Sequence, residues 1–258
     1  MGPEIRFEQV SRRFGTVSAV DVVDLSIAPG SFVALVGESG SGKSTLLRAI
    51  NRLDESMRSE GVGREGRVTI GGEDVAAAPL TRLRRKIGYV FQSIGLFPHM
   101  DVAANIAIGR RVRGETLSEA EIAVLLEQVG LPASFAARMP RELSGGQAQR
   151  VGIARALAIE PEILLLDEPF AALDPVTRDA LGKTVRALHE ARGLASILVT
   201  HDMAEAMLLA DRVIVLAHGK IVADATPTEL AAGRGGAEAE ALVAIPREQA
   251  RRIAELGG

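Results

Sequence analysis

Residues 32–45 of this chain read Phe32-Val33-Ala34-Leu35-Val36-Gly37-Glu38-Ser39-Gly40-Ser41-Gly42-Lys43-Ser44-Thr45, and this stretch decides the fold. The five apolar residues at its start predict a short buried strand, and residues 44–52 predict a helix. Between them, residues 37–44 match the pattern Gly-x-x-x-x-Gly-Lys-Ser in full. A strand, a glycine-rich turn and a helix in this order predict a phosphate-binding loop in an α/β core.

The chemistry of this loop follows from its residue types. Glycines allow the backbone to wrap closely around phosphate groups, because no Cβ atom intervenes. Consecutive N–H groups and the start of the helix then face the negative charge. Lys43 is placed to reach the outer phosphates of a nucleotide, and Ser44 is placed to bind Mg²⁺. The alternative, a glycine-rich turn with an incidental lysine, leaves the flanking strand and helix unexplained.

The composition narrows the class of protein. The chain has 258 residues, 47% of them hydrophobic, which is enough for one large domain or two small ones with a substantial core. Its net charge of −3 gives no general basic field for nucleic acid, although a local patch is compatible with it. The absence of cysteine excludes disulfides and thiolate metal sites. No apolar stretch resembles a signal peptide or a membrane span, so we expect a soluble, cytoplasmic protein that meets a membrane only through a partner.

Strand and helix patterns alternate along the chain, as in an α/β protein. Short apolar or alternating runs predict strands at 5–7, 32–36, 68–70, 87–90, 163–166, 196–199, 212–216 and 220–223. Between about residues 93 and 158 the pattern turns helical, and Ser118 with Glu121 predicts a capping box. We therefore predict one domain over residues 1–232, with a helical subdomain inserted at about 93–158. Residues 233–258 follow as a short tail, with a helix from Pro246 to Leu256.

Two acidic residues follow the apolar run at 163–166. Asp167 can hold Mg²⁺ through a water molecule, and Glu168 can orient or deprotonate an attacking water. Taken alone, this pair is equally compatible with a strand that leaves into solvent. Beside a phosphate-binding loop, the pair favours a site that hydrolyses a nucleotide.

A second glycine-rich turn follows in the sequence as Leu143-Ser144-Gly145-Gly146-Gln147-Ala148-Gln149-Arg150. Ser144 predicts the cap of a helix that starts at about Gly146. Capping alone does not explain the two glycines, which lower helix stability without a local gain. The glycines therefore need a reason beyond the helix itself.

Together these motifs resemble the ATP-binding cassette (ABC) ATPases over nearly the whole chain, from about Ile5 to Glu229. The order and spacing of the motifs carry the resemblance: the loop at 37–45, Gln92, the signature at 143–147, Asp167-Glu168, Ala172-Leu173-Asp174 and His201. The resemblance implies an α/β fold, with a P-loop NTPase (RecA-like) core, an antiparallel β subdomain and an inserted α-helical subdomain. It also implies ATP hydrolysis with Mg²⁺ by an ABC nucleotide-binding domain at residues 1–232.

The resemblance assigns roles to individual residues. It implies nucleotide contacts from Phe14, Gly37, Glu38, Ser39, Gly40, Ser41, Gly42, Lys43, Ser44, Thr45, Gln92 and Asp167. It implies catalytic roles for Lys43, Glu168 and His201, and Mg²⁺ binding by Ser44, Gln92 and, through water, Asp167. Ser144, Gly145, Gly146 and Gln147 would act in trans on ATP held by a second subunit, and Asp174 would join the two sites.

Three of these assignments have a simpler alternative when each residue is taken alone. Phe14 would stack on adenine, but many relatives have tyrosine at this place, so a role in the core is the alternative. Gln92 taken alone would be a polar strand end. His201 taken alone would more often be a structural histidine than a contact to the γ-phosphate.

A separate cassette without a membrane segment favours an importer, because exporters usually fuse the two. Residues 87–100 and 167–178 resemble the subgroup that takes up glycine betaine, choline, carnitine and other osmoprotectants, and the most distinctive run is Ile94-Gly95-Leu96-Phe97-Pro98-His99. The resemblance implies a head-to-tail homodimer on the inner face of the cell membrane. Its partners would be an integral permease and, indirectly, an extracytoplasmic binding protein, but no nucleic acid. Some members add C-terminal regulatory domains, and the short tail leaves no room for them, so we expect no osmotic sensing by this subunit.

Several alternatives stay open. Residues 51–67 form a longer segment than in the simplest relatives and are similar to phosphate-uptake cassettes, so phosphate, an amino acid or a polyamine is the nearest alternative cargo. An ABC protein acting on nucleic acid or the ribosome is disfavoured, because the sequence has no coiled-coil insertion, second cassette or zinc cysteines. A regulator that binds ATP without hydrolysis conflicts with Glu168 and His201.

Other charged residues carry no predicted role. The basic run of Arg82, Arg84, Arg85 and Lys86 is typical of a solvated helix face. His99, His189 and His218 lack the spacing of metal ligands.

Overall fold

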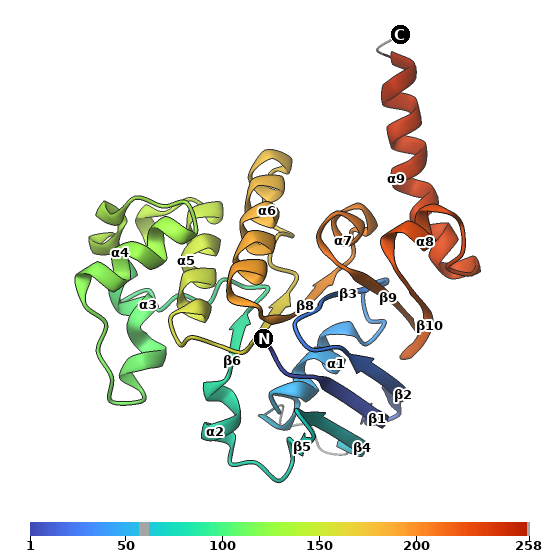
Figure 1. Ribbon diagram of the computed structural model, residues 1–258, viewed down its shortest axis with the longest axis horizontal. Helices are drawn as coiled ribbons and strands as arrows, with labels where there is room; N and C mark the ends of the chain where they lie inside the picture. The colour runs from blue at the N-terminus through green and yellow to red at the C-terminus, as the bar shows by residue number, and fades with distance from the viewer. Residues whose placement is uncertain (57–61, 257–258) are drawn as a thin grey trace. The chain divides into compact units, whose positions relative to one another are not determined.

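The computed structural model describes residues 1–56 and 62–256 (Figure 1). The chain divides into two compact units, each assembled from separate stretches of sequence. One unit, here called the signature unit because it contains residues 143–147, comprises Met1–Pro3 and Ala78–Ser196. The other, here called the loop unit because it contains the phosphate-binding loop, comprises Glu4–Ala77 and Ile197–Gly258.

An antiparallel sheet forms one part of the loop unit. Its strands are β1 (Ile5–Phe14), β2 (Val17–Ile27), β4 (Val62–Ile70) and β5 (Glu73–Asp74). They follow the order β2-β1-β4-β5, and Ile5 lies opposite both Ile27 and Ile70. Ile5 and Phe7 are buried while Arg6 is exposed, which is the alternation expected of a sheet with one solvated face. The sequence pattern predicted parts of β1 and β4 but missed β2.

A second sheet carries the phosphate-binding loop. Within the loop unit it contains β3 (Phe32–Val36), β9 (Arg212–Ala217), β10 (Lys220–Ala225) and the residues from Ile197 onward of β8 (Ala195–Thr200). These strands follow the order β10-β9-β3-β8. Strand β3 runs parallel to β9, with Val36 opposite Val215, whereas β10 runs antiparallel to β9. All five residues of β3 are buried, which explains its apolar sequence.

Two helices pack on the two sheets of the loop unit, one on each. Helix α1 (Lys43–Ile50) packs on β2 and β4, and α7 (Met203–Leu209) packs on β3. Leu46, Leu47 and Ile50 form the buried face of α1. Packing on the antiparallel sheet therefore holds the helix that follows the phosphate-binding loop.

The signature unit is rich in helices. They include α2 (Leu80–Arg85), α3 (Val102–Arg111), α4 (Glu119–Gln128), α5 (Gly145–Leu157) and α6 (Pro175–Arg192). Helices α3, α4 and α5 pack on one another, as the green to yellow ribbons of Figure 1 show. The predicted capping box is present at the start of α4, where the Ser118 N–H donates to Glu121 Oε2 at 2.8 Å.

Two parallel strands bring the acidic pair into the signature unit. Strand β6 (Ile87–Val90) pairs with β7 (Ile163–Asp167), and Val90 lies opposite Leu166. Because both strands run in the same direction, the residues that follow β6 and the acidic end of β7 emerge at the same edge. Gln92 and Asp167 are placed near one another in this way.

The C-terminal helix is longer than the sequence predicts. Helix α8 (Pro227–Ala231) is followed by α9, which spans Ala237–Leu256 and contains Pro246 in its interior, rather than starting at Pro246. Proline is favoured in the first turn of a helix, which is why the sequence pattern pointed there. Ala239 and Val243 are buried, and α9 packs on α7, α8 and β10. Burial of this first half outweighs the hydrogen bond that proline removes.

Candidate functional site

The phosphate-binding loop leaves β3 through a backbone that only glycine can follow. Gly37, Gly40 and Gly42 have φ values of 152°, 81° and 103°. A Cβ atom on Gly37 would lie 2.1 Å from the Leu216 carbonyl oxygen, and one on Gly42 would lie 2.1 Å from that of Ala19. The loop is therefore a cradle of backbone groups that any larger residue would fill.

Lys43 lies at the centre of this cradle. Its side chain is buried, with 4% of the residue exposed, and Nζ donates to the carbonyl oxygens of Gly37 at 2.8 Å and Glu38 at 2.7 Å. In the part of the chain that the structure describes, no side chain caps the first turn of α1, whose N-cap residue is Gly42. A buried ammonium group and a helix N-terminus without a side-chain cap fit an anion with several acceptor oxygens, such as a polyphosphate.

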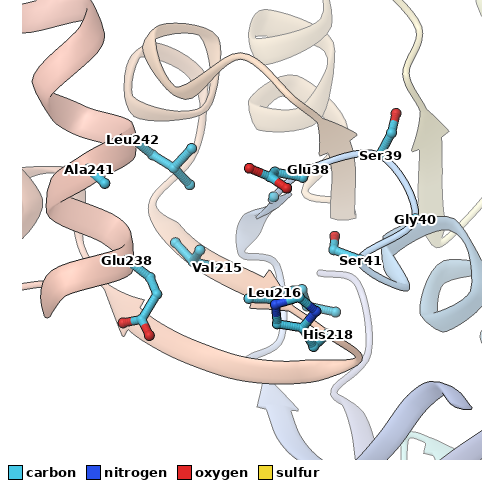
Figure 2. Close-up of a pocket in the computed structure, with 12 residues that line it drawn as sticks. Glu38, Ser39, Gly40, Ser41, Val215, Leu216, His218, Glu238, Ala241 and Leu242 are labelled. Atoms are coloured by element: carbon cyan, nitrogen blue, oxygen red, sulfur yellow. The ribbon is translucent and has the colours of Figure 1, made fainter.

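The turn between β9 and β10 supports the loop from one side. The Gly219 N–H donates to the Ser41 carbonyl oxygen at 3.1 Å. Figure 2 shows a pocket along the loop, in which Glu38 and Ser41 lie near Leu216 and His218, with Leu242 of α9 at the rim. The volume of this pocket is about 340 Å³. The sequence pattern held no signal for this support, although it predicted the two strands at 212–216 and 220–223.

Two further predicted residues lie in the loop unit. Phe14 is half-buried at the end of β1, where it pairs with Val17. His201 is exposed directly after β8. The next residue, Asp202, accepts hydrogen bonds from the N–H groups of Ala204 at 2.9 Å and Glu205 at 3.1 Å, so it caps α7. The roles of Phe14 and His201 toward a nucleotide stay predictions.

The structure brings three predicted residues together in the signature unit. Asp167 is 1% exposed at the end of β7, and its Oδ2 accepts a 2.8 Å hydrogen bond from the Tyr89 hydroxyl. Glu168 Oε2 accepts from Gln92 Nε2 at 3.2 Å. Glu168 also has a φ of 45°, a left-handed conformation that side chains rarely adopt. Such strain is typical of functional positions, where the surrounding structure enforces it.

The signature turn is a capped helix start, as predicted, and α5 begins at Gly145. Ser144 Oγ accepts from the Gln147 N–H at 3.3 Å, and Gln147 Oε1 accepts from the Ser144 N–H at 3.0 Å. In both bonds the hydroxyl hydrogen of Ser144 takes no part, so it can be donated elsewhere. Asp174 caps α6 in a similar way, and its carboxylate accepts from the Thr177 N–H at 3.0 Å.

The pKa of the Asp174 carboxyl is lowered by these capping bonds. The largest cause is a hydrogen bond from the Thr177 side chain, followed by one from the Thr177 N–H. Both bonds favour the charged form. Asp174 therefore keeps its negative charge to a lower pH than an ordinary aspartate.

The predicted Mg²⁺ ligands have suitable chemistry. Ser44 offers a hydroxyl, Gln92 an amide oxygen and Asp167 a carboxylate, and Mg²⁺ prefers oxygen ligands. Ser44 belongs to the loop unit, whereas Gln92 and Asp167 belong to the signature unit. Within residues 1–56 and 62–256, no group of three or more histidine, cysteine or acidic side chains could hold a metal ion by itself. A site with few protein ligands suits Mg²⁺, which keeps several waters and binds substrate phosphates.

Comparison with known proteins identifies the family. The sequence profile of the ABC transporter family matches residues 20–171, which include the phosphate-binding loop, the signature turn and the acidic pair. The chain belongs to this family. It is an ABC ATPase, and the cassette has the fold that its motifs predicted.

Curated relatives of the cassette are importer subunits by name. The glycine betaine uptake system ATP-binding protein YehX of Escherichia coli strain K12 is 44% identical over 86% of this chain and 71% of its own length. The glycine betaine/carnitine/choline transport ATP-binding protein OpuCA of Bacillus subtilis strain 168 is 44% identical over 88% of this chain and 58% of its length. The sulfate/thiosulfate import ATP-binding protein CysA of Mycobacterium tuberculosis strain H37Rv is 46% identical over 85% of this chain and 60% of its length.

A solved structure supports the same fold. The ATP-binding cassette MJ0796, determined as a dimer in a post-hydrolysis state with ADP and Pi, matches with a TM-score of 0.76 and 34% identity. The match covers 86% of this chain and 98% of that one. The present chain spans less than two thirds of the length of OpuCA and of CysA.

Proposed function

We propose that this cassette is the ATP-hydrolysing subunit of an importer for glycine betaine, choline, carnitine or a similar quaternary amine. Two copies pair head to tail, and each phosphate-binding loop meets the signature turn of the other copy. The dimer binds a separate integral permease at the inner face of the membrane, and an extracytoplasmic binding protein supplies the solute. Within residues 1–56 and 62–256, no helix has the length and apolarity of a membrane span.

The open space at Gly145 carries the proposal of a shared site. Among the described residues, a Cβ atom on Gly145 would meet no atom within 4 Å apart from its chain neighbours and the backbone of its own helix, and its φ is not positive. Glycine in a helix interior costs about 1 kcal/mol relative to alanine, and Gly145 is the first residue of α5. Neither packing nor backbone geometry within the chain explains this cost. A close approach by a group from outside, such as a γ-phosphate held by the partner's loop, does explain it.

The residues of the cassette divide the chemistry between them. Lys43 and the N–H groups of the loop bind the phosphates, and His201 orients the γ-phosphate. Glu168 accepts a proton from the attacking water on its carboxylate. The hydrogen bond from Gln92 and the left-handed backbone of Glu168 hold that carboxylate in place. Ser44 would offer Mg²⁺ a hydroxyl, Gln92 an amide oxygen and Asp167 a carboxylate, and the bound ion would neutralise negative charge on the phosphates.

Two of the relatives support a quaternary amine as the cargo, and a third relative favours a different cargo, sulfate or thiosulfate. YehX and OpuCA are named for quaternary amines. CysA is named for sulfate and thiosulfate, at a similar identity. Residues 94–99 favour the first class, because this run is the part of the sequence that resembles the osmoprotectant subgroup. Sulfate import is the second candidate.

Transport by the assembled complex tests the cargo. The cassette is co-expressed with its permease and binding protein, and the complex is placed in liposomes that contain ATP. We expect uptake of labelled glycine betaine, choline or carnitine, with ATP hydrolysis stimulated in parallel. Uptake of sulfate without any quaternary amine would replace the proposed cargo. Co-purification with nucleic acid or ribosomes instead of a membrane protein would overturn the transport role.

Dimer formation tests the shared site. Glu168→Gln should bind ATP without hydrolysis and elute as a dimer from a sizing column when ATP and Mg²⁺ are present. Ser144→Arg in the same background is the matched control, because the signature turn acts only on the partner's ATP. This variant should bind ATP with unchanged affinity and stay monomeric. A Ser144→Arg variant that dimerises with ATP would contradict the head-to-tail arrangement.

A further inference from the structure

The basic run at residues 82–86 contributes to a pocket that the nucleotide site does not use. Arg84 and Arg85 of α2 line this pocket together with Arg113, which follows α3. Its volume is about 310 Å³, and its remaining lining residues are Leu80, Thr81, Gly109, Val112 and Ile159. All of them belong to the signature unit, and the site is here called the arginine pocket. Part of the basic run therefore has a concave setting in addition to the solvated face that its sequence indicates.

Arg113 is held at the arginine pocket by backbone groups. Its Nη1 donates to the Ile159 carbonyl oxygen at 3.3 Å, and its Nη2 donates to the carbonyl oxygen of Arg85. Burial lowers the pKa of the Arg113 guanidinium, because the charged group loses part of its contact with water. A guanidinium has five N–H donors, so these two bonds leave donors for a ligand. Arg113 therefore combines a fixed position with a partly dehydrated positive charge.

The acidic residues that act electrostatically on Arg113 are paired with a different arginine. These residues are Glu115 and Glu160, and each forms an ion pair with Arg110 at 2.6 Å. Among the described residues, no acidic side chain lines the arginine pocket itself. The three arginines of the lining therefore make the pocket complementary to an anion with more than one negative charge.

The arginine pocket also has an apolar part. Leu80, Val112 and Ile159 belong to its lining, and Val112 is 81% exposed. Covering an exposed valine with hydrocarbon removes apolar surface from water and is favourable. The combination of arginines and exposed apolar side chains suits an anion joined to hydrocarbon better than a small hydrated inorganic ion.

We propose that the arginine pocket binds the phosphate group of an organic phosphate, with its hydrocarbon part against Leu80, Val112 and Ile159. A phosphate monoester carries a charge of roughly −1.5 to −2 at pH 7 and three terminal oxygens, so it accepts from several guanidinium groups at once. A carboxylate carries one charge, which a single guanidinium fork matches. A free phosphate ester and a phospholipid headgroup share this chemistry. The inference goes beyond the proposed function, in which no residue of this pocket takes part.

Calorimetric titration of the full chain with hexyl phosphate tests the charged part of the pocket. Arg85→Glu should weaken binding by at least about tenfold, because it removes a charged hydrogen-bond donor and adds a like charge. Arg111→Glu is the matched control, since Arg111 is an exposed residue of α3 with the same change of charge and lies outside the lining. It should bind hexyl phosphate within about twofold of the unchanged protein, because a distant exposed charge is screened by salt. An equal loss in both variants would overturn the pocket and indicate a general basic field.

Two further comparisons test the apolar part and the location. Val112→Ala should weaken hexyl phosphate binding by about threefold to fivefold and leave the affinity for inorganic phosphate unchanged, because it removes exposed apolar surface without altering charge. Equal affinity of the unchanged protein for hexyl phosphate and inorganic phosphate would overturn the proposed ligand class. Lys43→Ala, which removes the ammonium group of the phosphate-binding loop, should bind hexyl phosphate normally. Loss of binding in Lys43→Ala with normal binding in Arg85→Glu would place the ligand at the loop and overturn the inference.

Vesicle flotation distinguishes the two sources of the phosphate group. The protein is mixed with vesicles of phosphatidylcholine and phosphatidic acid, and with vesicles of phosphatidylcholine alone. Flotation with the acidic vesicles that Arg85→Glu loses and Arg111→Glu retains would support a lipid headgroup as the ligand. Binding of hexyl phosphate without flotation would support a free phosphate ester. Absence of both would overturn the arginine pocket, and it would leave the proposed function standing, because ATP-driven dimerisation of Glu168→Gln requires none of these residues.

Discussion

The Tyr89 hydroxyl donates a 2.8 Å hydrogen bond to Asp167 Oδ2 and thereby ties β6 to the acidic end of β7. Tyr89 lies opposite Leu165 on the neighbouring strand β7, and Leu165 is two residues before Asp167. The Tyr89 side chain therefore extends along β7 to reach the Asp167 carboxylate. Because Asp167 is buried, this carboxylate depends on protein donors rather than on bulk water. The bond therefore fixes one of the predicted Mg²⁺ ligands.

The first prediction concerns this bond. Tyr89→Phe keeps the ring and its contact with Phe91, whose centroid lies 4.5 Å away, but removes the hydroxyl. The free energy of unfolding should fall by about 1.5–3 kcal/mol, as expected for a lost hydrogen bond to a charged group. The Mg²⁺ concentration needed for half-maximal ATPase activity should rise. Urea denaturation and a Mg²⁺ titration measure the two effects, and unchanged values for both would remove Tyr89 from the site.

The second prediction concerns the backbone of Glu168. Its left-handed conformation costs roughly 1–2 kcal/mol for a residue with a Cβ atom, and glycine avoids most of this cost. Glu168→Gly should therefore unfold at a higher urea concentration than Glu168→Ala, although both lack the carboxylate and neither should turn over ATP. Equal midpoints for the two variants would show that the conformation is not strained.

The fold could be predicted where local patterns decide it. Strands β3 and β6 begin and end where the apolar runs indicated, because both are buried and bounded by polar or glycine residues. Strand β2 was missed, since its pairing with β1 depends on two stretches folding together rather than on its own sequence. The start of α9 was misplaced for a similar reason: the burial of Ala239 and Val243 against other elements overrides the local signal of Pro246.

The prediction of the candidate site was limited in the same way, by contacts between residues far apart in the sequence. Lys43, Asp167 and Glu168 could be predicted because a motif fixes their spacing in the sequence. Tyr89 acts through a contact with Asp167, 78 positions away, and it lies outside the motifs of the nucleotide site. A tyrosine inside the apolar strand β6 was the one available signal, since a buried hydroxyl needs a partner.

The third prediction concerns Lys43. Loss of an ammonium group about 4 Å from a phosphate, at an effective dielectric near 20, removes roughly 4 kcal/mol per unit charge before desolvation. Lys43→Ala should therefore lower ATP affinity by at least about a hundredfold and abolish hydrolysis. Lys183→Ala is a matched control, because Lys183 is exposed and pairs only with Asp179 among the ion pairs found in the described part of the chain. Calorimetric titration with ATP compares the two, and normal binding by Lys43→Ala would contradict the assignment.

The fourth prediction concerns pH. The folded-state pKa of Asp174 is lowered by the Thr177 side chain and N–H, whereas the unfolded chain has the ordinary value of 3.8. The unfolded state therefore binds a proton at Asp174 more readily than the folded state does. The ionised Asp174 carboxylate thus stabilises the folded state above about pH 4, and this stabilisation is lost as the pH falls through the lower folded-state pKa. Asp174→Asn should reduce stability at pH 7 more than at pH 3. Urea midpoints at the two pH values, at low salt because Asp174 is exposed, measure this difference; an equal reduction at both would show that the carboxylate charge makes no contribution.

The last prediction concerns Arg155, which joins the signature helix to the segment after Gln92. From α5, its Nη1 donates to the Gly95 carbonyl oxygen at 2.7 Å and its Nη2 to that of Ile94 at 3.0 Å. Burial lowers the pKa of the Arg155 guanidinium, because the charged group loses contact with water. The two carbonyl oxygens accept the hydrogen bonds that water would otherwise accept. A lysine has no planar fork and cannot reproduce both bonds in the same geometry.

Arg155→Lys should therefore loosen residues 94–97 while α5 stays folded. Amide exchange should become faster in residues 94–97, and stimulation of ATPase activity by the permease should fall more than basal activity. Arg186→Lys is the matched control, because Arg186 also lies on a helix but pairs with Glu190 on its exposed side. Equal amide exchange in both variants would mean that Asn105 of α3 holds residues 94–97 without help from Arg155. The Asn105 side chain accepts a hydrogen bond from the Phe97 N–H and donates one to the Phe97 carbonyl oxygen. A selective loss of stimulation would instead show that the bonds from Arg155 to residues 94 and 95 are needed for the response to the permease.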